Sequence, residues 1–431
     1  MEKATPKAQT CDGADPNDGL CGILYFAGSK DGVKDQLWRT DGTAAGTYEV
    51  QEINPAGSSK PSGFVKYNGR NYFAADDGVH GMELWVTDGT PSGTHIVADI
   101  NPTGGSDPAE FVACGERLFF TASDGATRGL YSTDGFLGSA VRAPGKAAYM
   151  DPYGLTVMGD LLYFGASLQA DGDTELWLWD GSLAQVAQDI NMEGSSYPSQ
   201  FTAVGDTLYF NAVDPDVGNE LRIGDSKGIA VAVNACPDVA GPCDGAPSAL
   251  WAVGSRLFFT AASGGGAPSE LWMHDGAIGK VVKDINPGDK ALIEALSDVN
   301  GRFVFTAVSG GERQVWSSDG TALGTQVLTN FTSLQEVRVL GRNESELHLL
   351  VVTGGHLELW TTDGTPLGTV RTYHSLSTQG DCALGTLGTV GTSMLFYAND
   401  GGSSFGVLRS TDAVQAGTQQ IGDVIVTSCG V

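Results

Sequence analysis

The chain has 431 residues, of which 61 are Gly, and its 51 Asp and Glu against 24 Lys and Arg give a formal net charge of −27. Such a charge repels phosphate backbones and anionic lipid headgroups, so it argues against nucleic-acid binding and membrane-surface binding. A hydrophobic content of 41% supports a packed core, and the sequence has no apolar run of about 18 residues that would predict membrane insertion.

The N-terminal segment, residues 1–21, is acidic and contains two cysteines. Met1–Thr10 is polar and lacks the apolar core of a signal peptide, so either the protein is cytosolic or the chain begins after a removed signal. The seven cysteines favour the second interpretation, because closely spaced pairs are unusual where thiols stay reduced. We therefore expect a secreted or cell-surface protein.

This segment also suggests a calcium site. Between the cysteines lie four side chains with oxygen ligands: Asp12, Asp15, Asn17 and Asp18. Calcium takes about six to eight oxygen ligands, often from such loops, although the distal Glu of an EF-hand is missing. The alternative is a solvated acidic turn.

One motif then recurs along the rest of the chain. It reads QLWRTDGT at Gln36, ELWVTDGT at Glu83, GLYSTDGF at Gly129, ELWLWDGS at Glu175, ELRIGDSK at Glu220, ELWMHDGA at Glu270, QVWSSDGT at Gln314, ELWTTDGT at Glu358 and VLRSTDAV at Val407. The nine copies are 44 to 50 residues apart, a spacing typical of β-propeller blades.

Each repeat contains four short apolar runs separated by turn residues. In the second repeat these are Pro61–Gly69, RNYFAA, the ELW run and Thr94–Ile100. Runs rich in Phe, Tyr, Val and Ile between Gly, Asn and Asp predict strands, and four strands repeated radially predict a propeller. The repeats form one domain, residues 22–431, with units that begin near residues 22, 69, 115, 159, 205, 254, 301, 342 and 391.

Two adjacent positions of the motif are expected to pack between blades. The position after the Glu is Leu or Val in every copy, and the next is Trp in six copies. Neighbouring residues of a strand face opposite sides of its sheet, so a blade covered on both sides needs both positions apolar. The alternative for the Trp residues is a platform that binds carbohydrate.

An Asp follows three residues after the aromatic position in all nine copies. These residues are Asp41, Asp88, Asp134, Asp180, Asp225, Asp275, Asp319, Asp363 and Asp412. Asp before Gly is typical of a turn in which the carboxylate accepts backbone N–H bonds. The alternative is a ring of bound cations.

The fifth repeat and its neighbouring loop depart from the pattern. If the unit around Leu221 is an insertion, the propeller has eight blades instead of nine. The connection that follows, Asn234–Pro247, contains the sequence CPDVAGPC. Cys236 and Cys243 bracket this loop, and we expect them to form a disulfide.

The C-terminus is expected to close the ring. The chain enters at a second strand, Gly22–Ala27, and Ile425–Gly430 aligns with the end of a first strand, Phe111–Gly115. We therefore expect the C-terminal strand to complete the N-terminal blade and remove two open sheet edges.

Such closure bears on the cysteines. It would bring Cys429 close to Cys21, in competition with a Cys11–Cys21 pair, and it leaves Cys114 as a candidate free and buried thiol. Sequence alone does not choose between these pairings.

The nine motifs resemble the bacterial ELWxxDGT repeat family, whose repeats are also described as hyalin-like and are frequent in exported myxobacterial proteins. The resemblance extends over residues 22–431. It implies an exported β-propeller-like repeat protein and no catalytic residues, because the family has no well-defined reaction. The repeats at Gly129, Glu220 and Val407 depart from the pattern.

Binding is expected on one face of this propeller. The second-to-third and fourth-to-first connections vary between repeats, whereas the other turns are uniform, and variable loops on a regular scaffold are common sites of recognition. The predicted ligand-binding residues are Asp76, Asp77, His80, Asp171, Asp173, Asp214 and Asp216. Asp171 and Asp173 also form, with Glu175, a second candidate calcium group, for which a solvated turn is the alternative.

The sequence therefore predicts a binding or assembly scaffold at the cell surface, with a protein or glycan partner and a monomeric state by default. The six His residues are scattered without an HExxH pattern. The alternative function is a polysaccharide hydrolase or lyase that uses two carboxylates facing the central channel, about 5 to 9.5 Å apart.

Overall fold

The computed structural model describes residues 22–225, 228–235, 244–264, 267–343, 345–377, 385–390, 393–398, 406–411 and 419–426. All the regular secondary structure in these ranges is β-strand. In the same ranges no helix has the length and apolarity needed to cross a membrane.

The strands follow one another along the chain in short antiparallel runs. The first five sheets contain β1 (Leu24–Gly28), β2 (Gln36–Thr40), β3 (Tyr48–Gln51); β4 (Ser62–Tyr67), β5 (Arg70–Asp76), β6 (Met82–Thr87), β7 (His95–Ala98); β8 (Ala109–Cys114), β9 (Arg117–Ser123), β10 (Arg128–Thr133), β11 (Val141–Arg142); β12 (Tyr149–Met158), β13 (Leu161–Leu168), β14 (Thr174–Trp179), β15 (Ala184–Gln188); and β16 (Ser199–Val204), β17 (Thr207–Asp214), β18 (Gly218–Asp225), β19 (Gly228–Val233). The other four contain β20 (Ser248–Val253), β21 (Arg256–Ala262), β22 (Ser269–His274), β23 (Gly279–Lys283); β24 (Glu294–Val299), β25 (Arg302–Ser309), β26 (Glu312–Ser318), β27 (Gln326–Val327); β28 (Leu334–Arg342), β29 (Leu347–Thr353), β30 (His356–Thr362), β31 (Val370–Ser377); and β32 (Gly385–Val390), β33 (Ser393–Ala398), β34 (Gly406–Thr411), β35 (Gln419–Val426).

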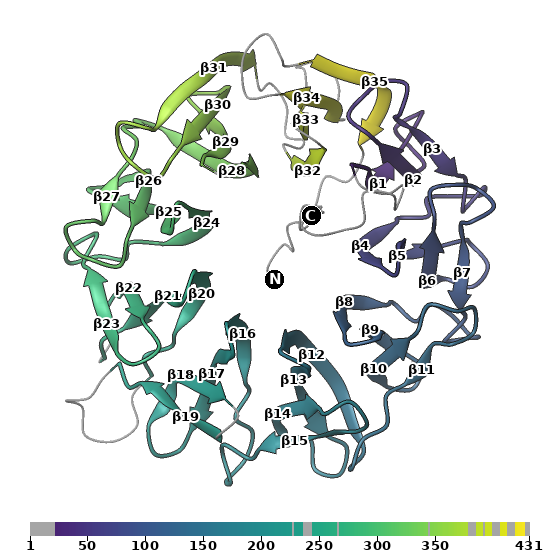
Figure 1. The fold of residues 1–431 in the computed structure, drawn as a ribbon, viewed down its shortest axis with the longest axis horizontal. Coiled ribbons are helices and arrows are strands. Elements are labelled where there is room, and N and C mark those ends of the chain that lie inside the picture. Colours follow the sequence, from purple (N-terminus) through teal and green to yellow (C-terminus); the bar gives the residue numbers. More distant parts are fainter. Residues whose placement is uncertain are drawn as a thin grey trace.

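These strands form nine antiparallel sheets arranged as the blades of a propeller (Figure 1). Within the described ranges, eight sheets have four strands in chain order and the sheet of β1, β2 and β3 has three. The first strand of each four-stranded sheet lies at the centre of the ring and the fourth on its outside (Figure 1). The predicted all-β propeller is confirmed, and Leu221 lies in β18 of an ordinary blade rather than in an insertion.

The hydrophobic core is divided into clusters between neighbouring blades. One cluster joins Leu37 and Val50 of the first blade to Phe73 and Trp85 of the second. Leu37 and Trp85 are buried, so the predicted packing role of the Leu and Trp positions is confirmed there. Each blade is covered on both sides, which requires apolar residues at consecutive positions of its strands.

The first and last blades also pack against each other. Phe26 and Trp38 share a cluster with Leu395 and Ile421, and β1 contacts both β32 and β35. In the described ranges the ring therefore has side-chain contacts at the place where the chain begins and ends.

The first two residues of the predicted closing strand do not belong to the first sheet. Ile425 and Val426 belong to β35, where they pair with Val407 and Gly406 of β34. The remaining residues of that prediction, 427–430, lie outside the described ranges. Completion of the first blade by the C-terminus stays a prediction.

The Asp of the repeated motif forms a turn. Asp41 accepts hydrogen bonds from the backbone N–H and the hydroxyl of Thr43, at 2.9 and 2.7 Å. The hydroxyl bond is the main reason that the pKa of Asp41 is lowered. The same two bonds recur at Asp88, Asp319 and Asp363. The turn interpretation is thus confirmed for these repeats.

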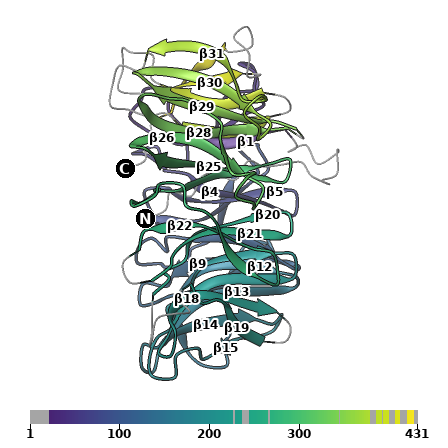
Figure 2. The same cartoon turned by 90° about the vertical axis from the view of Figure 1, so that its left-hand side faces the viewer.

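The strands of each blade run between two faces of the ring, seen from the side in Figure 2. Because neighbouring strands are antiparallel, the uniform turns share one face. The second-to-third turns and the fourth-to-first connections share the other, which we call the variable-loop face. These connections interlock, since Ser106 N–H donates to the carbonyl of Met82, and Ser123 N–H donates to the carbonyl of Ser106.

Candidate functional site

The Glu that begins the repeated motif holds the connections of the variable-loop face. Glu83 is buried, and its carboxylate accepts N–H bonds from Ile100, Asn101 and Ser106 and a 2.6 Å bond from the Ser106 hydroxyl. These donors lie in the connection between β7 and β8. One buried carboxylate therefore organises a whole loop, since unpaired N–H groups would be costly there.

Other blades use the same contact with different residues. Glu175 accepts bonds from Ile190 and Ser196, and Glu220 accepts bonds from Ala235 and Gly245. In the first blade Gln36 both accepts and donates, because it bonds the N–H of Ile53 and the carbonyl of Gly57. The motif carboxylates of these blades therefore have a structural role that the sequence analysis did not assign.

The third blade replaces the carboxylate with a guanidinium. Gly129 stands at the Glu position, and a Cβ there would lie 2.7 Å from Nε of Arg142. Arg142 donates to the carbonyl of Tyr149 and to Thr127, and pairs with Asp124 at 3.2 Å. A donor thus replaces an acceptor, and backbone carbonyls replace N–H groups as partners.

A second repeated feature lies near the beginning of the first strands. Six consecutive blades hold an exposed residue other than Gly with φ between 43° and 53°: Lys60, Asp107, Asp151, Tyr197, Ala246 and Leu292. Five of them precede a Pro. Positive φ is uncommon outside Gly, so a shared backbone conformation presents five kinds of side chain at six positions. We call these six residues the rim positions.

A groove lies beside three of the rim positions, against the first strands β8, β12 and β16. Its volume is about 510 Å³, and its lining includes Glu110, Phe111, Tyr153, Thr156, Gln200 and Phe201. Phe111 stacks on Phe120 and Phe201 lies against Phe210, with ring centroids 5.7 Å apart in both pairs. The lining is therefore aromatic at its base, with a few polar side chains, a composition typical of ligand sites.

The predicted ligand-binding residues lie on the variable-loop face but are divided between three blades. Asp76 and Asp77 hold the β5–β6 turn by accepting N–H bonds from Gly78 and His80. His80 is exposed and pairs with Asp77 at 2.7 Å, and the hydrogen bond to that carboxylate raises the pKa of His80.

The other predicted residues lie in the fourth and fifth blades. Asp171 accepts an N–H bond from Asp173, and Asp214 accepts one from Asp216. Asp214 also pairs at 3.0 Å with Arg222, which is buried where most repeats have Trp. Asp171 and Asp214 are turn acceptors, and the structure does not bring all seven predicted residues into one site.

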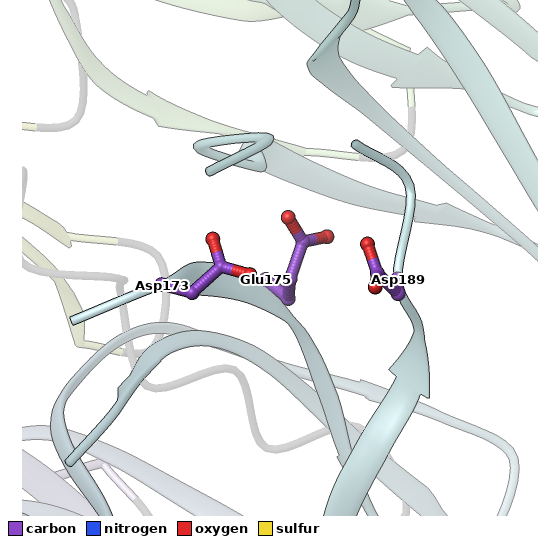
Figure 3. Close-up of side chains that lie close together, drawn as sticks. All are labelled: Asp173, Glu175 and Asp189. Carbon is purple, nitrogen blue, oxygen red and sulfur yellow. The ribbon is translucent and has the colours of Figure 1, made fainter. Parts of the chain in front are cut away.

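One acidic group includes part of the second calcium prediction. Carboxylate oxygens of Asp173, Glu175 and Asp189 lie within 4.8 Å of one another (Figure 3). Asp171 of the predicted group is not a member, and Asp189 replaces it from the chain after β15. The Oδ1 atom of Asp173 is buried without a hydrogen-bond partner, whereas both oxygens of Glu175 accept bonds. Calcium binding stays a prediction.

The remaining predicted site residues lie outside the described ranges. These are the calcium candidates Asp12, Asp15, Asn17 and Asp18 and the disulfide candidates Cys11, Cys21, Cys236, Cys243 and Cys429. Cys114 is described, and it is free and buried, as predicted. Burial raises the pKa of its thiol.

Comparisons with known proteins give no family. No family model matches the chain, and no curated protein matches it. Among solved structures, a prolyl endopeptidase is similar with a TM-score of 0.43 and 13% identity, over 73% of this chain and 49% of that chain. Prolyl oligopeptidase B from Galerina marginata, as apo protein, is similar with a TM-score of 0.43 and 9% identity, over 75% and 52%. The chain thus spans about half the length of these structures, and likeness at this level carries no argument about its activity.

Proposed function

We propose that the protein is an extracellular or cell-surface binding and assembly scaffold that recognises a protein or glycan through its variable-loop face. The rim positions carry this proposal. One strained backbone conformation is repeated six times while the exposed side chain changes, and strained residues often mark functional sites.

The buried carboxylates support the proposal in a second way. The carboxylate oxygens of Glu83 and Glu175 accept hydrogen bonds from backbone and hydroxyl donors, so these residues hold loops in place. The alternative, a polysaccharide hydrolase or lyase, needs a pair of carboxylates near its substrate. Of the groove residues, only Glu110 is a carboxylate, so this groove does not offer such a pair.

A glycan and protein array probed with the whole chain tests the scaffold function. We expect binding without release of new reducing ends from the bound polysaccharides. The variant Tyr197→Ser with Met192→Ser removes two side chains of the variable-loop face that are 63% and 88% exposed. It should bind more weakly to the array ligands than the wild type.

The matched control changes equally exposed residues of the uniform face. Leu323 and Leu367 are 91% and 96% exposed and lie in the DGTxxGT turns. Leu323→Ser with Leu367→Ser should keep the wild-type binding. New reducing ends, or equal losses in the two double variants, would reject the proposal.

We also propose that calcium, if the protein binds it, is held by the group of Asp173, Glu175 and Asp189 in addition to the N-terminal segment. The buried Asp173 Oδ1 atom without a donor supports a cation there, because a buried carboxylate oxygen needs a partner. Calcium should raise the melting temperature relative to EDTA, since a ligand of the native state stabilises it. Asp189→Asn should reduce that difference, and no effect of EDTA on either protein would rule out the cation.

Three further features belong to the same proposal. They are export, disulfides among the cysteines outside the described ranges, and a ring closed by the C-terminal strand, as the resemblance to ELWxxDGT repeats implies. The contacts between β1 and the last blade support closure. Mass spectrometry of non-reduced peptides would show whether Cys429 is linked to Cys21.

A further inference from the structure

The groove on β8, β12 and β16 is lined by residues that closely follow three of the rim positions in the chain. Asp107, Asp151 and Tyr197 belong to the same three blades as the groove residues Glu110, Tyr153 and Phe201, and they lie two to four residues earlier in the chain. Two exposed carboxylates and one exposed phenol ring therefore precede the groove residues in the same three blades.

The strand edges in the groove are poorly suited to pair with a ligand strand. β8, β12 and β16 each lie at the edge of their sheet, and each contains a register shift. Glu110 and Gln200 have φ of 55° and 58° at these irregular sites, and Leu155 N–H is already bonded to the Glu110 carboxylate. Bulges of this kind prevent edge pairing, so recognition must use side chains.

The charge of those side chains selects the ligand. Asp107, Glu110 and Asp151 are exposed and acidic. Two cations are bonded nearby and already have partners. Arg128 is held by the carbonyl of Asp107 and the hydroxyl of Thr121, and Arg142 by the carbonyl of Tyr149 and the carboxylate of Asp124. The net charge of −27 further disfavours anionic ligands.

We propose that this groove binds an extended, Lys- or Arg-rich segment of a partner protein, an inference that rests on the proposed scaffold function. The aliphatic stems of such side chains pack on apolar surface while their charged heads remain solvated. Phe111, Tyr153 and Phe201 supply that surface, and the three carboxylates supply charge-assisted partners for the heads. An exposed aromatic ring such as Tyr197 also attracts cations.

Fluorescence anisotropy with a labelled peptide of alternating Gly and Arg tests this site on the whole chain. The comparison peptide has citrulline in place of Arg, which keeps the shape and removes the charge. We expect the arginine peptide to bind at least about tenfold more tightly, with an affinity that falls as salt increases.

Two variants of equal charge separate the groove from the acidic surface as a whole. Asp107→Asn, Glu110→Gln and Asp151→Asn together should weaken binding of the arginine peptide by about tenfold. The control combines Glu52→Gln, Asp289→Asn and Glu312→Gln, which are exposed in other blades. It should bind as the wild type does.

Three results would overturn the proposal: no binding of the arginine peptide, equal affinity for the citrulline peptide, or equal weakening in the two triple variants. The scaffold function has its own readout, because the array ligands and the Tyr197→Ser with Met192→Ser variant test it without the peptide. If array ligands bind through the variable-loop face but the arginine peptide does not bind, the scaffold stands and the cationic ligand is wrong.

Discussion

At the scale of the residue, the last Gly of the DGTxxGT turn is needed for space. A Cβ on Gly93 would lie 1.9 Å from Oδ1 of Asp88, and the same conflict arises between Gly46 and Asp41. The carboxylate reaches this position because it accepts bonds from Thr90. The motif therefore repeats its Asp and this Gly together.

Gly93→Ala should destabilise the protein by about 2 kcal/mol, because the new methyl group displaces the Asp88 carboxylate from its donors. Urea unfolding of the whole chain measures this loss. Ser92→Ala in the same exposed turn is the control, and we expect a change below about 0.5 kcal/mol there. Equal effects of the two substitutions would contradict the argument from space.

Glu270 is a member of the buried Glu series with one carboxylate oxygen that has no partner, while Ile285 N–H bonds its carboxylate. Its Oε2 atom has no hydrogen-bond partner, because Ala291 stands where Ser106 serves Glu83 and Ser196 serves Glu175. Ala291 accepts the N–H of Val308 as Ser106 accepts that of Ser123, which confirms the equivalence. Burial and the nearby charge of Asp284 raise the pKa of Glu270 to about 7.

The raised pKa predicts how stability depends on pH. The unfolded Glu ionises near its ordinary value of 4.5, whereas the folded one stays protonated up to about 7, so stability from this group is present at low pH and lost as pH rises between them. Ala291→Ser supplies a hydroxyl donor and should raise the free energy of unfolding at pH 8 by about 1 kcal/mol, with little change at pH 4.

Denaturant melts of the wild type and of Ala291→Ser at several pH values measure this difference. Glu270→Gln should act in the same direction at pH 8, since it removes the charge. Glu83→Gln is the contrasting control. The NH2 group of the new Gln would face the N–H donors that bond the Glu83 carboxylate, so we expect the protein to be destabilised at both pH values. A gain from Ala291→Ser that is the same at pH 4 and pH 8 would show that Glu270 is not the cause.

At the scale of the element, the first strand of the blade contains a repeated irregularity. Gly63 and Gly154 have φ of 68° and 70°, and at the same place in other blades Glu110, Gln200 and Ala249 adopt φ of 55°, 58° and 52°. The register shifts at the same residues of β4, β8, β12, β16 and β20. The bulge is therefore set by the blade and not by Gly.

Ala249→Gly should stabilise the protein by about 0.5 kcal/mol, since relief of the left-handed strain outweighs the greater freedom of Gly in the unfolded chain. Ala252→Gly in the same strand, where φ is ordinary, should destabilise it by a similar amount. Thermal melts of both variants compare the two effects. Two destabilised variants would show that the bulge carries no strain.

The sequence could predict the turn at Asp88, because Asp, Gly and Thr are adjacent and act within one loop. It could not predict the role of Glu83, whose donors lie 17 to 23 residues later. A simple signal was present, since a charged residue directly before two buried positions needs a partner. Asp189 was missed for the same reason, because it meets Asp173 only after β14 and β15 have folded back.

At the scale of the whole molecule, one blade contact differs from the others because no short connection links its two sheets. Trp38 is 6% exposed and packs with Leu395 and Ile421 across this contact. The predicted propeller fixed the order of the blades, but the groove on β8, β12 and β16 depended on which side chains three separate repeats bring to the centre. The sequence pattern of a single repeat does not show which side chains from different repeats will meet there.

Trp38→Ala should increase hydrogen exchange in β1 and β33 more than in β17, because the lost packing lets the first and last blades separate. We expect a loss of about 3 kcal/mol in the free energy of unfolding. Trp316→Ala at the contact of the sixth and seventh blades is the control, since the short connection between β23 and β24 keeps those sheets close. Local exchange that is equal at both sites would argue against a weaker seam.

At the rim positions, folding constrains the backbone while binding would act on the side chain, whereas on most surfaces both constrain the same side chains. The backbone conformation of the rim positions recurs in six blades, with and without a following Pro, so it is set by the blade, and their side chains are exposed. Under the proposed binding function, substitutions at Lys60, Asp107, Asp151, Tyr197, Ala246 and Leu292 would change specificity without disturbing folding. The propeller would then serve as a fixed framework, and descendants of this chain could acquire new partners through single substitutions at these positions.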